Sequence, residues 1–352
     1  MPDGAFDANL IRAAAQLLEQ GGLVAFPTET VYGLGADAEN PAAVASIYAA
    51  KARPANHPII VHLAPEADLS YWASSIPAQA QALIAAFWPG PLTLILPRAV
   101  AIPDAVSGGQ DSIGVRCPSH PVAQALLRCF KQGRGGIAAP SANKFGRISP
   151  TTAQHVLDEF GAPQEQITHG ILNAVLDGGA SAVGIESTIL DLSRVATKGS
   201  VLLRPGHISA QQIAEVLGVM PASADVSAPR ASGTLAAHYA PRTPLLLVQP
   251  EDWPQLSSHL DGYRCALINF DASLNLNKLI EISVILPADA DGYAHGLYAA
   301  LRQMDDAGVD LILVQAPPAS AAWNGVNDRL RRAAHDSLGL GERLRTENQI
   351  AI

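Results

Sequence analysis

Two short apolar runs near the N-terminus, Leu23–Phe26 and 58–62, have the length of buried strands. Pro27 ends the first run, and the small polar residues at 28–30 follow it on a turn that leads into a glycine-containing segment. Binding and catalytic groups concentrate on loops that a rigid scaffold positions. This stretch therefore predicts a strand that delivers hydroxyl groups to the mouth of a site.

Two cations, Lys51 and Arg53, stand about one helix further along, directly before the second apolar run. Cations beside glycines on loops between buried strands favour an anion site, and a polyphosphate fits such a site best. The alternative is a solvated helix end at which both cations complement the helix dipole. Arg116 lies within another apolar run, so its charge must be paired or must face a cleft, because an unpaired buried charge is costly.

The composition favours two domains. A chain of 352 residues exceeds one ordinary core, and 48% of its residues are apolar against 16% charged, so it can bury sizeable cores. No apolar run approaches the roughly 20 residues of a membrane span, and no basic and then apolar leader precedes the first helical segment. We expect a soluble cytoplasmic protein with no membrane partner.

The charge and the cysteines exclude further classes of protein. A formal net charge of −9 argues against a general nucleic-acid binder, although it allows a local basic cleft. Cys117, Cys129 and Cys265 are far apart and form no CxxC pair, which argues against a disulfide framework and a structural zinc site. We expect them to be small buried hydrophobic residues.

The apolar pattern divides the chain into a first domain at 1–217, a linker at 218–243 and a second domain at 244–352. An amphipathic helix at 7–20 is expected to bury Leu10, Ile11, Ala14, Leu17 and Leu18. In the first domain, strands are also expected at 92–96, 112–117, 136–139, 175–178, 187–192 and 201–204, and helices at 77–87, 120–130, 153–160 and 209–217. The glycine-rich segment 104–111 is expected to be a mobile loop, and the Pro, Ala, Ser and Gly-rich linker lacks periodicity.

Strand and helix patterns alternate in the second domain. The expected strands are 245–248, 265–270, 284–286 and 311–315, and the expected helices are 251–260, 290–307 and 323–336. This alternation predicts a small parallel α/β domain. No GxGxxG or Walker loop follows its strands, so the sequence indicates no independent nucleotide site there.

Six motifs occur in this order: PTETVYGLG, KARPANHPIIVH, FWPGPLTLIL, IGVRCPSHP, APSANKFGRISPT and GIESTILDL. Together they make the chain resemble the YrdC/Sua5 family, the threonylcarbamoyl-AMP synthases, over residues 7–245, and the added C-terminal third is similar to the long Sua5 form. The resemblance implies an α/β (α+β) fold, with a twisted mixed sheet around a concave site and a smaller Rossmann-like parallel domain.

The resemblance also implies a reaction. L-threonine, bicarbonate and ATP would give threonylcarbamoyl-AMP and pyrophosphate, the first step of N6-threonylcarbamoyladenosine formation on tRNAs that read ANN codons. Such a nucleotidyl transfer needs positioning and charge neutralisation more than a protein nucleophile. Mg²⁺ would arrive with ATP, held by phosphate oxygens and water, with no metal ligand assigned to the protein. Assistance from Glu29 or Asn143 is the alternative that stays open. The expected partners are the substrates, a downstream transferase complex and at most a weak direct contact to tRNA.

Site residues follow from the motif positions. The catalytic set implied by the resemblance is Lys51, Arg53 and Arg116. The threonine-binding set is Thr30, His62, Arg116, Ala139 and Ser187. The nucleotide-binding set is Lys51, Arg53, His57, Ser112, Ser141, Asn143, Ser149, Arg204, Thr234, His238 and Tyr239. Three alternatives stay open: a salt bridge from Arg116 to Glu29 or Glu186, a purely structural His62, and serines that only cap or close turns.

The linker departs from the long-form pattern, because Ser232-Gly233-Thr234 precedes His238-Tyr239 where some members carry a lysine-containing segment. We expect the linker to close over the nucleotide as a lid, with backbone amides and Thr234 in place of the missing side chain. Other functions stay open: a carbamoyl-transfer protein of the hydrogenase-maturation type, an RNA-binding module, and a second domain that senses a ligand or docks a partner. The three scattered cysteines argue against the first, since such proteins normally add zinc-finger cysteine pairs.

Overall fold

The computed structural model describes residues 7–256, 259–260, 262–271 and 280–340. Two compact units divide the chain. The first holds Met1–Phe145 and Ser149–Thr234, and the second holds Gly146–Ile148 and Leu235–Ile352. Each unit has its own sheet.

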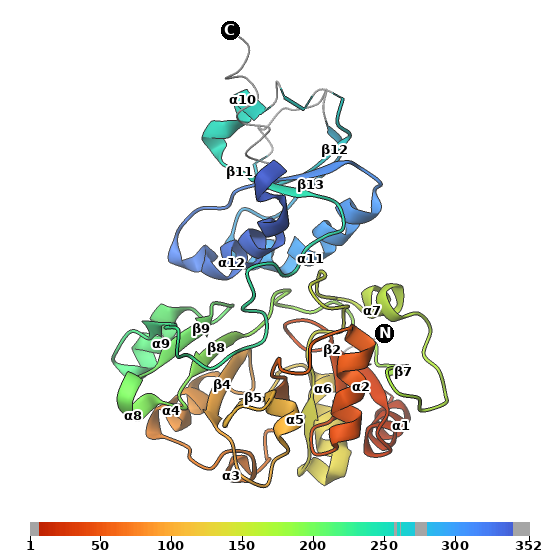
Figure 1. The fold of residues 1–352 in the computed structure, drawn as a ribbon, viewed down its shortest axis with the longest axis vertical. Coiled ribbons are helices and arrows are strands. Elements are labelled where there is room, and N and C mark those ends of the chain that lie inside the picture. The colour runs from red at the N-terminus through yellow and green to blue at the C-terminus, as the bar shows by residue number, and fades with distance from the viewer. Residues whose placement is uncertain (1–6, 257–258, 261, 272–279, 341–352) are drawn as a thin grey trace. The chain divides into compact units, whose positions relative to one another are not determined.

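A ten-stranded mixed sheet forms the first unit, in the order β10-β9-β8-β4-β5-β3-β6-β2-β1-β7 (Figure 1). Its strands are β1 Leu23–Phe26, β2 Gly33–Asp37, β3 Ile60–Leu63, β4 Leu92–Pro97, β5 Ser112–Arg116, β6 Gly136–Ala138, β7 Leu172–Val175, β8 Thr188–Asp191, β9 Val201–Arg204 and β10 Ala222–Ser223. The pairs β3–β5 and β4–β8 are parallel, whereas β4–β5 and β8–β9 are antiparallel. The predicted mixed sheet is confirmed.

Ten helical segments accompany this sheet in the described part of the first unit. They are α1 Ala8–Glu19, α2 Pro41–Lys51, α3 Leu69–Trp72, α4 Ala78–Phe87, α5 Asp104–Ser107, α6 Pro121–Cys129, the 3₁₀ helix η1 Phe130–Gly133, α7 Ala153–Phe160, α8 Val195–Lys198 and α9 Ala210–Leu217. Side-chain caps fix several of their starts: Asp7 accepts from the Asn9 amide, and Ser209 forms a reciprocal capping box with Gln212. Each cap satisfies an amide that the helix itself leaves unpaired.

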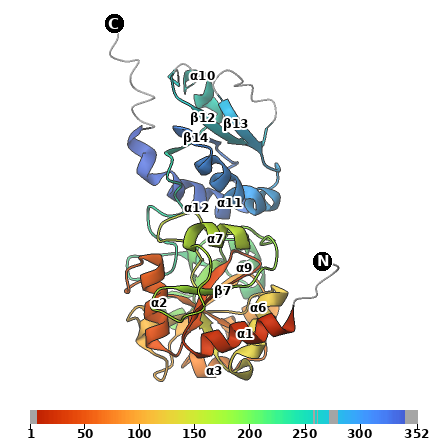
Figure 2. The same ribbon diagram turned by 90° about the vertical axis from the view of Figure 1, so that its right-hand side faces the viewer.

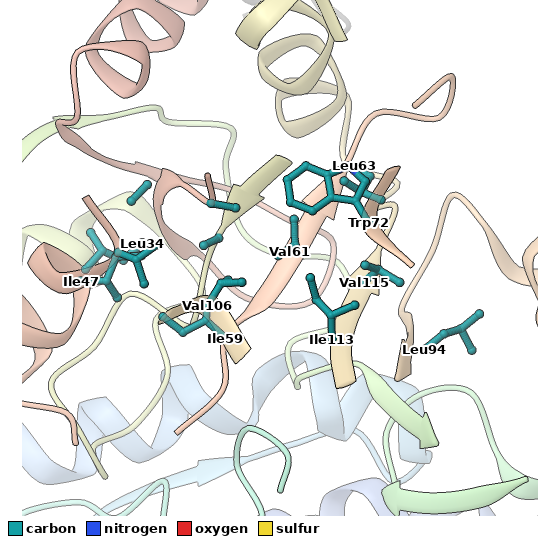
Figure 3. Close-up of a cluster of buried hydrophobic side chains, with 14 of the residues drawn as sticks. Leu34, Ile47, Ile59, Val61, Leu63, Trp72, Leu94, Val106, Ile113 and Val115 are labelled. Carbon is teal, nitrogen blue, oxygen red and sulfur yellow. The ribbon is translucent and has the colours of Figure 1, made fainter. Parts of the chain in front are cut away.

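Buried apolar side chains cover the sheet on both faces. Val61 on β3, Leu94 on β4 and Val115 on β5 belong to the larger cluster, together with Trp72 (Figure 3). A second cluster forms where α1 and α6 pack, and it includes Phe26 from β1. Each fully buried side chain of this kind contributes about 1.5–3 kcal/mol, so the sheet is a firm base for the loops at its strand ends.

The second unit is a four-stranded parallel sheet in the order β11-β14-β12-β13, which confirms the predicted parallel α/β domain. Its elements are β11 Leu245–Val248, η2 Pro250–Asp252, α10 Trp253–Leu256, β12 Cys265–Asn269, β13 Ile280–Ile285, α11 Ala290–Asp306, β14 Leu311–Gln315, η3 Ala321–Trp323, α12 Asn324–Ala333 and η4 His335–Ser337. Figure 2 shows α11 and α12 together on one side of this sheet.

Several local predictions were wrong. Leu10 is 60% exposed, because the buried stripe of α1 runs through Ile11, Ala14, Ala15 and Leu18 and leaves Leu10 at its margin. Strand β7 ends at Val175 instead of beginning there, and β2 occupies a segment for which we predicted no strand. The glycine-rich segment 104–111 contains α5, which ends at Gly108 with φ 62°.

In the second unit, strand β13 begins earlier than the predicted 284–286, and only α10 and a 3₁₀ turn occupy the described part of the predicted helix 251–260. The rest of that prediction, at 257–258, lies outside the described residues. None of the helices in the described part of the chain combines the length and hydropathy that a membrane crossing requires.

Candidate functional site

The carboxyl ends of β3 and β5 bring two predicted threonine-binding residues together. His62 and Arg116 are directly paired in the parallel ladder, so both side chains emerge on the same face of the sheet. Arg116 is 3% exposed, and its guanidinium donates to the Gly90 carbonyl at 3.2 Å and to Thr30 Oγ1 at 2.9 Å. A third arm, Nη2, lies 2.7 Å from Glu29 Oε1 as an ion pair. Of the two salt bridges left open from the sequence, the one to Glu29 is present.

The turn after β1 presents Thr30. Thr28 Oγ1 accepts the backbone amides of Thr30 and Val31, each at 3.2 Å, and donates to the Val31 carbonyl at 2.6 Å. Because the Thr28 proton is used in that last bond, the 2.8 Å contact between the two threonine hydroxyls places the donor on Thr30. The hydroxyl of Thr30 is thereby fixed between Thr28 and Arg116.

His62 is held in its neutral form. Its side chain is 3% exposed and meets the edge of the Phe26 ring at a centroid distance of 6.0 Å. Burial, followed by the nearby Arg116 charge, lowers the pKa of His62 to about 3. Among the described residues, its Nδ1 atom has no hydrogen-bond partner. A neutral imidazole with an unused ring nitrogen can donate to or accept from a ligand.

Arg204, at the end of β9, holds the turn that carries Ser187. Its Nε and Nη2 atoms donate to the Ser187 carbonyl at 3.1 and 2.9 Å, and Nη2 also reaches Ser187 Oγ at 3.2 Å. The same Oγ lies 2.8 Å from the hydroxyl of Thr93 on β4. Gly206 closes this turn so tightly that a Cβ there would lie 2.5 Å from the Thr188 amide nitrogen.

Lys51 is the last residue of α2 and is only 1% exposed. Its ammonium donates to the Ser141 carbonyl at 2.6 Å and to the Asn143 carbonyl in a shorter contact. Burial, and next the charge of Arg53, lower the pKa of Lys51 well below its ordinary value. The solvated helix end that the sequence left open is therefore wrong for Lys51, whose buried side-chain nitrogen is held by two backbone carbonyls.

Arg53 lies beside a small aromatic group. Its guanidinium carbon is 6.0 Å from the centre of the Phe145 ring, and the His57 ring meets the same phenyl ring at 5.4 Å. Arg53 Nη2 donates to the Pro58 carbonyl at 2.8 Å and to Ser232 Oγ at 3.4 Å. Burial and then the charge of Arg53 lower the pKa of His57, so this ring too is neutral beside the cation.

Ser232 of the linker contacts both Arg53 and Arg204. Its hydroxyl accepts from Arg53, and its carbonyl accepts from Arg204 Nη1 at 2.9 Å. The preceding segment is anchored as well: Gln110 exchanges two hydrogen bonds with the backbone of Arg230, at 2.7 and 3.1 Å. Ala231 packs with Ile95 and Ile189 against the sheet. The linker as far as Thr234 thus belongs to the first unit and lies at the predicted anion site.

The remaining predicted residues of the first unit are turn and strand-end positions. Ala139 donates its amide to the Ile60 carbonyl at 3.0 Å, and Ser149 donates to Glu186 Oε1 at 2.5 Å. Ser112 begins β5, on the same face as Arg116 and separated from it by Gly114. Thr234 donates to the Ala231 carbonyl at 3.0 Å within the linker itself.

His238 and Tyr239 belong to the second unit. Their rings contact each other at 4.2 Å, and Tyr239 packs against Tyr298 and beneath the guanidinium of Arg329. The contact of these two residues with a nucleotide therefore stays a prediction.

Three residues that contact the site are not predicted from the sequence: Ser232, Thr93 and Gln110. In the linker, the sequence predicts the contact for Thr234 instead of Ser232. The proline and glycine-rich linker has no periodicity from which a facing residue could be read. Within the described residues, no group of three or more His, Cys, Asp or Glu side chains is placed to hold a metal ion.

The fold and the site define a class: a two-domain α/β protein whose mixed-sheet domain gathers buried arginines, a buried lysine and hydroxyl groups at its strand ends. Comparisons with known proteins specify it further. Residues 16–206 match the Sua5–YciO–YrdC family model, described as "Telomere recombination", and residues 208–335 match the model of the threonylcarbamoyl-AMP synthase C-terminal domain. The chain belongs to the threonylcarbamoyl-AMP synthase family, in the long Sua5 form.

Individual relatives agree over nearly the whole chain. The threonylcarbamoyl-AMP synthase of Pyrococcus abyssi is 37% identical over 92% of this chain and 94% of its own length. The Bacillus subtilis protein of the same name is 38% identical over 92% of each chain. A crystal structure of P. abyssi Sua5 complexed with L-threonine covers 94% of this chain and 96% of its own, with 35% identity and a TM-score of 0.82.

Proposed function

We propose that this protein is an L-threonylcarbamoyladenylate synthase, a nucleotidyltransferase that converts L-threonine, bicarbonate and ATP to threonylcarbamoyl-AMP and pyrophosphate. One observation supports this most directly. Arg204 hydrogen-bonds to Ser187, of the predicted threonine set, and to Ser232, which also contacts Arg53, of the predicted phosphate set. Arg204 thus links the predicted threonine site to the predicted phosphate site. A reaction between an amino acid and a nucleotide requires the two sites to be adjacent.

The geometry suits catalysis by positioning. In the proposed reaction the threonine amine becomes a carbamate, and a carbamate oxygen attacks the α-phosphorus of ATP while pyrophosphate leaves. Arg116 and Thr30 would hold the threonine carboxylate, since a guanidinium with fixed arms suits a carboxylate. Lys51, Arg53 and Arg204 would neutralise phosphate charge in a buried setting, where electrostatic stabilisation is strongest.

Mg²⁺ would enter with ATP. It prefers oxygen ligands and retains water, so triphosphate oxygens would supply most of its coordination. Lys51 and Arg53 donate to the Ser141 and Pro58 carbonyls, and their positive charge suits binding of the phosphates. The protein's role would be to hold the triphosphate that carries the ion.

Pyrophosphate release tests the proposal. Wild-type protein with ATP, Mg²⁺ and bicarbonate is given L-threonine, L-serine or no amino acid, and Arg116→Ala is measured in parallel. We expect threonine-dependent release that the substitution abolishes, with threonylcarbamoyl-AMP detected by mass spectrometry. Release that is indifferent to threonine in the wild type, or no release at all, would contradict the proposal.

We further propose that the linker acts as a lid over the nucleotide. Its support is the anchoring of residues 230–232 to Gln110, Arg53 and Arg204. Replacing residues 230–239 by a glycine–serine segment of equal length keeps the tether and removes the contacts. We expect weaker ATP binding and slower turnover, and unchanged values of both would rule out the lid.

The product is a labile mixed anhydride, so we propose cytoplasmic handover to a transferase complex that modifies tRNA, with at most weak direct binding of tRNA by this chain. The net charge of −9 opposes strong intrinsic affinity for RNA. Salt titration of tRNA binding separates this view from an RNA-binding module. Tight binding that weakens steeply with salt, without pyrophosphate release, would favour the module.

A further inference from the structure

Glu29 is a buried carboxylate with one oxygen unused. The residue is 6% exposed, and its Oε1 atom forms the 2.7 Å ion pair with Arg116. Its Oε2 atom has no hydrogen-bond partner among the described residues. The backbone is fixed, because the Glu29 carbonyl accepts the Val183 amide at 2.7 Å. A buried charged oxygen without a partner is costly, so a ligand group that supplies one would be bound favourably.

The Arg116–Glu29 pair complements the charges of an α-amino acid: its cation suits the carboxylate, and its carboxylate suits the ammonium. A free amino acid carries a carboxylate and an ammonium separated by one carbon atom. If the carboxylate binds Arg116, it competes with Glu29 for the same guanidinium, and the two negative charges repel each other unless a cation stands beside Glu29. The substrate's own ammonium is that cation. The pair therefore selects for a zwitterion over a simple carboxylic acid.

We propose that Glu29 binds the ammonium group of the amino-acid substrate and accepts a proton from it when the amine is carboxylated. This inference rests on the proposed function. In the step, the ammonium gives one proton to Glu29 and becomes a free amine. The amine nitrogen then bonds to the bicarbonate carbon, the carbon–hydroxyl bond breaks, and the hydroxide takes the second nitrogen-bound proton and leaves as water. The products are a carbamate and protonated Glu29, so atoms and charge balance.

The other titratable groups around Glu29 are poorer bases for this step. The guanidinium of Arg116 has no acceptor atom. Cys117, whose pKa is raised to about 12 by burial and next by the Glu29 charge, stays a thiol. Burial lowers the pKa of His120, although the Glu29 charge acts to raise it. Both ring nitrogens of His120 have partners: Nδ1 accepts from the Val122 amide, and Nε2 contacts the Gly178 carbonyl. His62 is a weak base, because burial, followed by the Arg116 charge, lowers its pKa to about 3.

Glu29→Gln tests the inference, because it keeps the size of the side chain and an oxygen acceptor for Arg116 while removing the charge. The matched control is Glu66→Gln, which makes the same change in the exposed 2.9 Å pair between Glu66 and Arg128. Two ligands are titrated calorimetrically: L-threonine, and 3-hydroxybutyrate, which is threonine without its amino group. ATP affinity and thermal unfolding report whether each variant folds.

Wild type and Glu66→Gln should prefer threonine to 3-hydroxybutyrate. Glu29→Gln should bind threonine at least tenfold more weakly and 3-hydroxybutyrate as well or better. Its threonine-dependent pyrophosphate release at pH 7.5 should fall about 100-fold, as general-base loss typically produces, and should recover as pH rises and free amine accumulates. Glu29→Asp should restore part of the preference.

Equal weakening of both ligands in Glu29→Gln would mean that the residue only orients Arg116, and would overturn the inference. So would wild-type release rates in that variant. Failure of the proposed function looks different, because the wild-type protein itself would then release no threonine-dependent pyrophosphate. If Glu29→Gln does not fold, the wild-type preference for threonine over 3-hydroxybutyrate still decides, and its absence overturns the inference.

Discussion

His62 and Arg116 occupy paired positions of two parallel strands, and burial, followed by the Arg116 charge, lowers the pKa of His62 so that the imidazole stays neutral. This pairing places a neutral ring beside a fixed positive charge in a buried setting. A ligand carboxylate that binds Arg116 would therefore meet a ring that can donate a hydrogen bond without adding charge.

The pairing predicts acid sensitivity. The pKa of His62 in the folded protein, about 3, lies below the ordinary 6.5. Between these two pH values His62 therefore binds a proton in the unfolded chain but not in the folded one. The contribution of neutral His62 to the free energy of unfolding is complete above pH 6.5 and is lost as pH falls from 6.5 towards 3. A shift from 6.5 to about 3 corresponds to a loss on the order of 5 kcal/mol at most. Denaturant titrations from pH 7 to 4 should show a shallower loss of unfolding free energy in His62→Gln, whereas His335→Gln, at an exposed position, should follow the wild type.

Lys51 predicts proton uptake on ATP binding. Burial and Arg53 depress the pKa of Lys51, and phosphate charge would raise it again, so the lysine should take up a proton when ATP binds above the depressed pKa. Calorimetry at pH 8.5 in two buffers of different ionisation enthalpy measures this uptake. Lys51→Arg keeps a permanent charge and should lose it. The same uptake in wild type and Lys51→Arg would assign the proton to another group.

A substitution at Gly206 is expected to disturb the Ser187 turn and thereby weaken threonine binding. A methyl group there would lie 2.5 Å from the Thr188 nitrogen and 2.8 Å from the Glu186 carbonyl oxygen. Because both atoms are backbone, Gly206→Ala must displace the Ser187 turn, and we expect a loss of about 2 kcal/mol of stability with more than tenfold weaker threonine binding. Gly339→Ala, where a Cβ meets nothing within 4 Å, should change neither property. Wild-type threonine affinity in Gly206→Ala would show that the Ser187 turn does not bind threonine.

Asp328 is the position in the second unit at which we expect a substitution to cost the most stability. It is 4% exposed and accepts from Arg332 at 3.0 Å on both oxygens, while Arg329, which is fully buried, lies 3.2 Å away. Asp328→Asn removes the negative charge that these arginines contact and should cost about 3 kcal/mol in urea unfolding. Glu281→Gln, in an exposed pair with Arg264, should have little effect. Equal, small losses in both variants would show that the Asp328 cluster is not structural.

The strands with continuous apolar runs were predictable from the sequence. β4 and β11 coincide with their predicted starts, because a run that is buried on both faces needs no knowledge of its neighbours. β2 was missed because its sequence, GLGAD, contains two glycines and resembles a turn. Glycine is required there: a Cβ at Gly35 would lie 2.8 Å from atoms of both Phe26 and Ile137.

The site was predictable where it depends on motifs and unpredictable where it depends on register. The sequence showed that Arg116 needs a partner, but choosing Glu29 over Glu186 requires knowing how β5 lies against the turn after β1. The contact from Ser232 to Arg53 and Arg204 joins residues far apart in the chain, from a segment without periodicity. No local pattern encodes such a contact.

Residues Gly146–Ile148 belong to the second unit although the chain on both sides of them belongs to the first. Arg147 pairs with Ala240, and Arg302 donates to the Ile148 carbonyl. The polypeptide therefore crosses from one body to the other at three points, two of which flank a loop between Asn143 and Ser149. Cutting the chain after the first unit would remove Ala240 and Arg302, the partners of this loop, between the predicted nucleotide-binding residues Asn143 and Ser149.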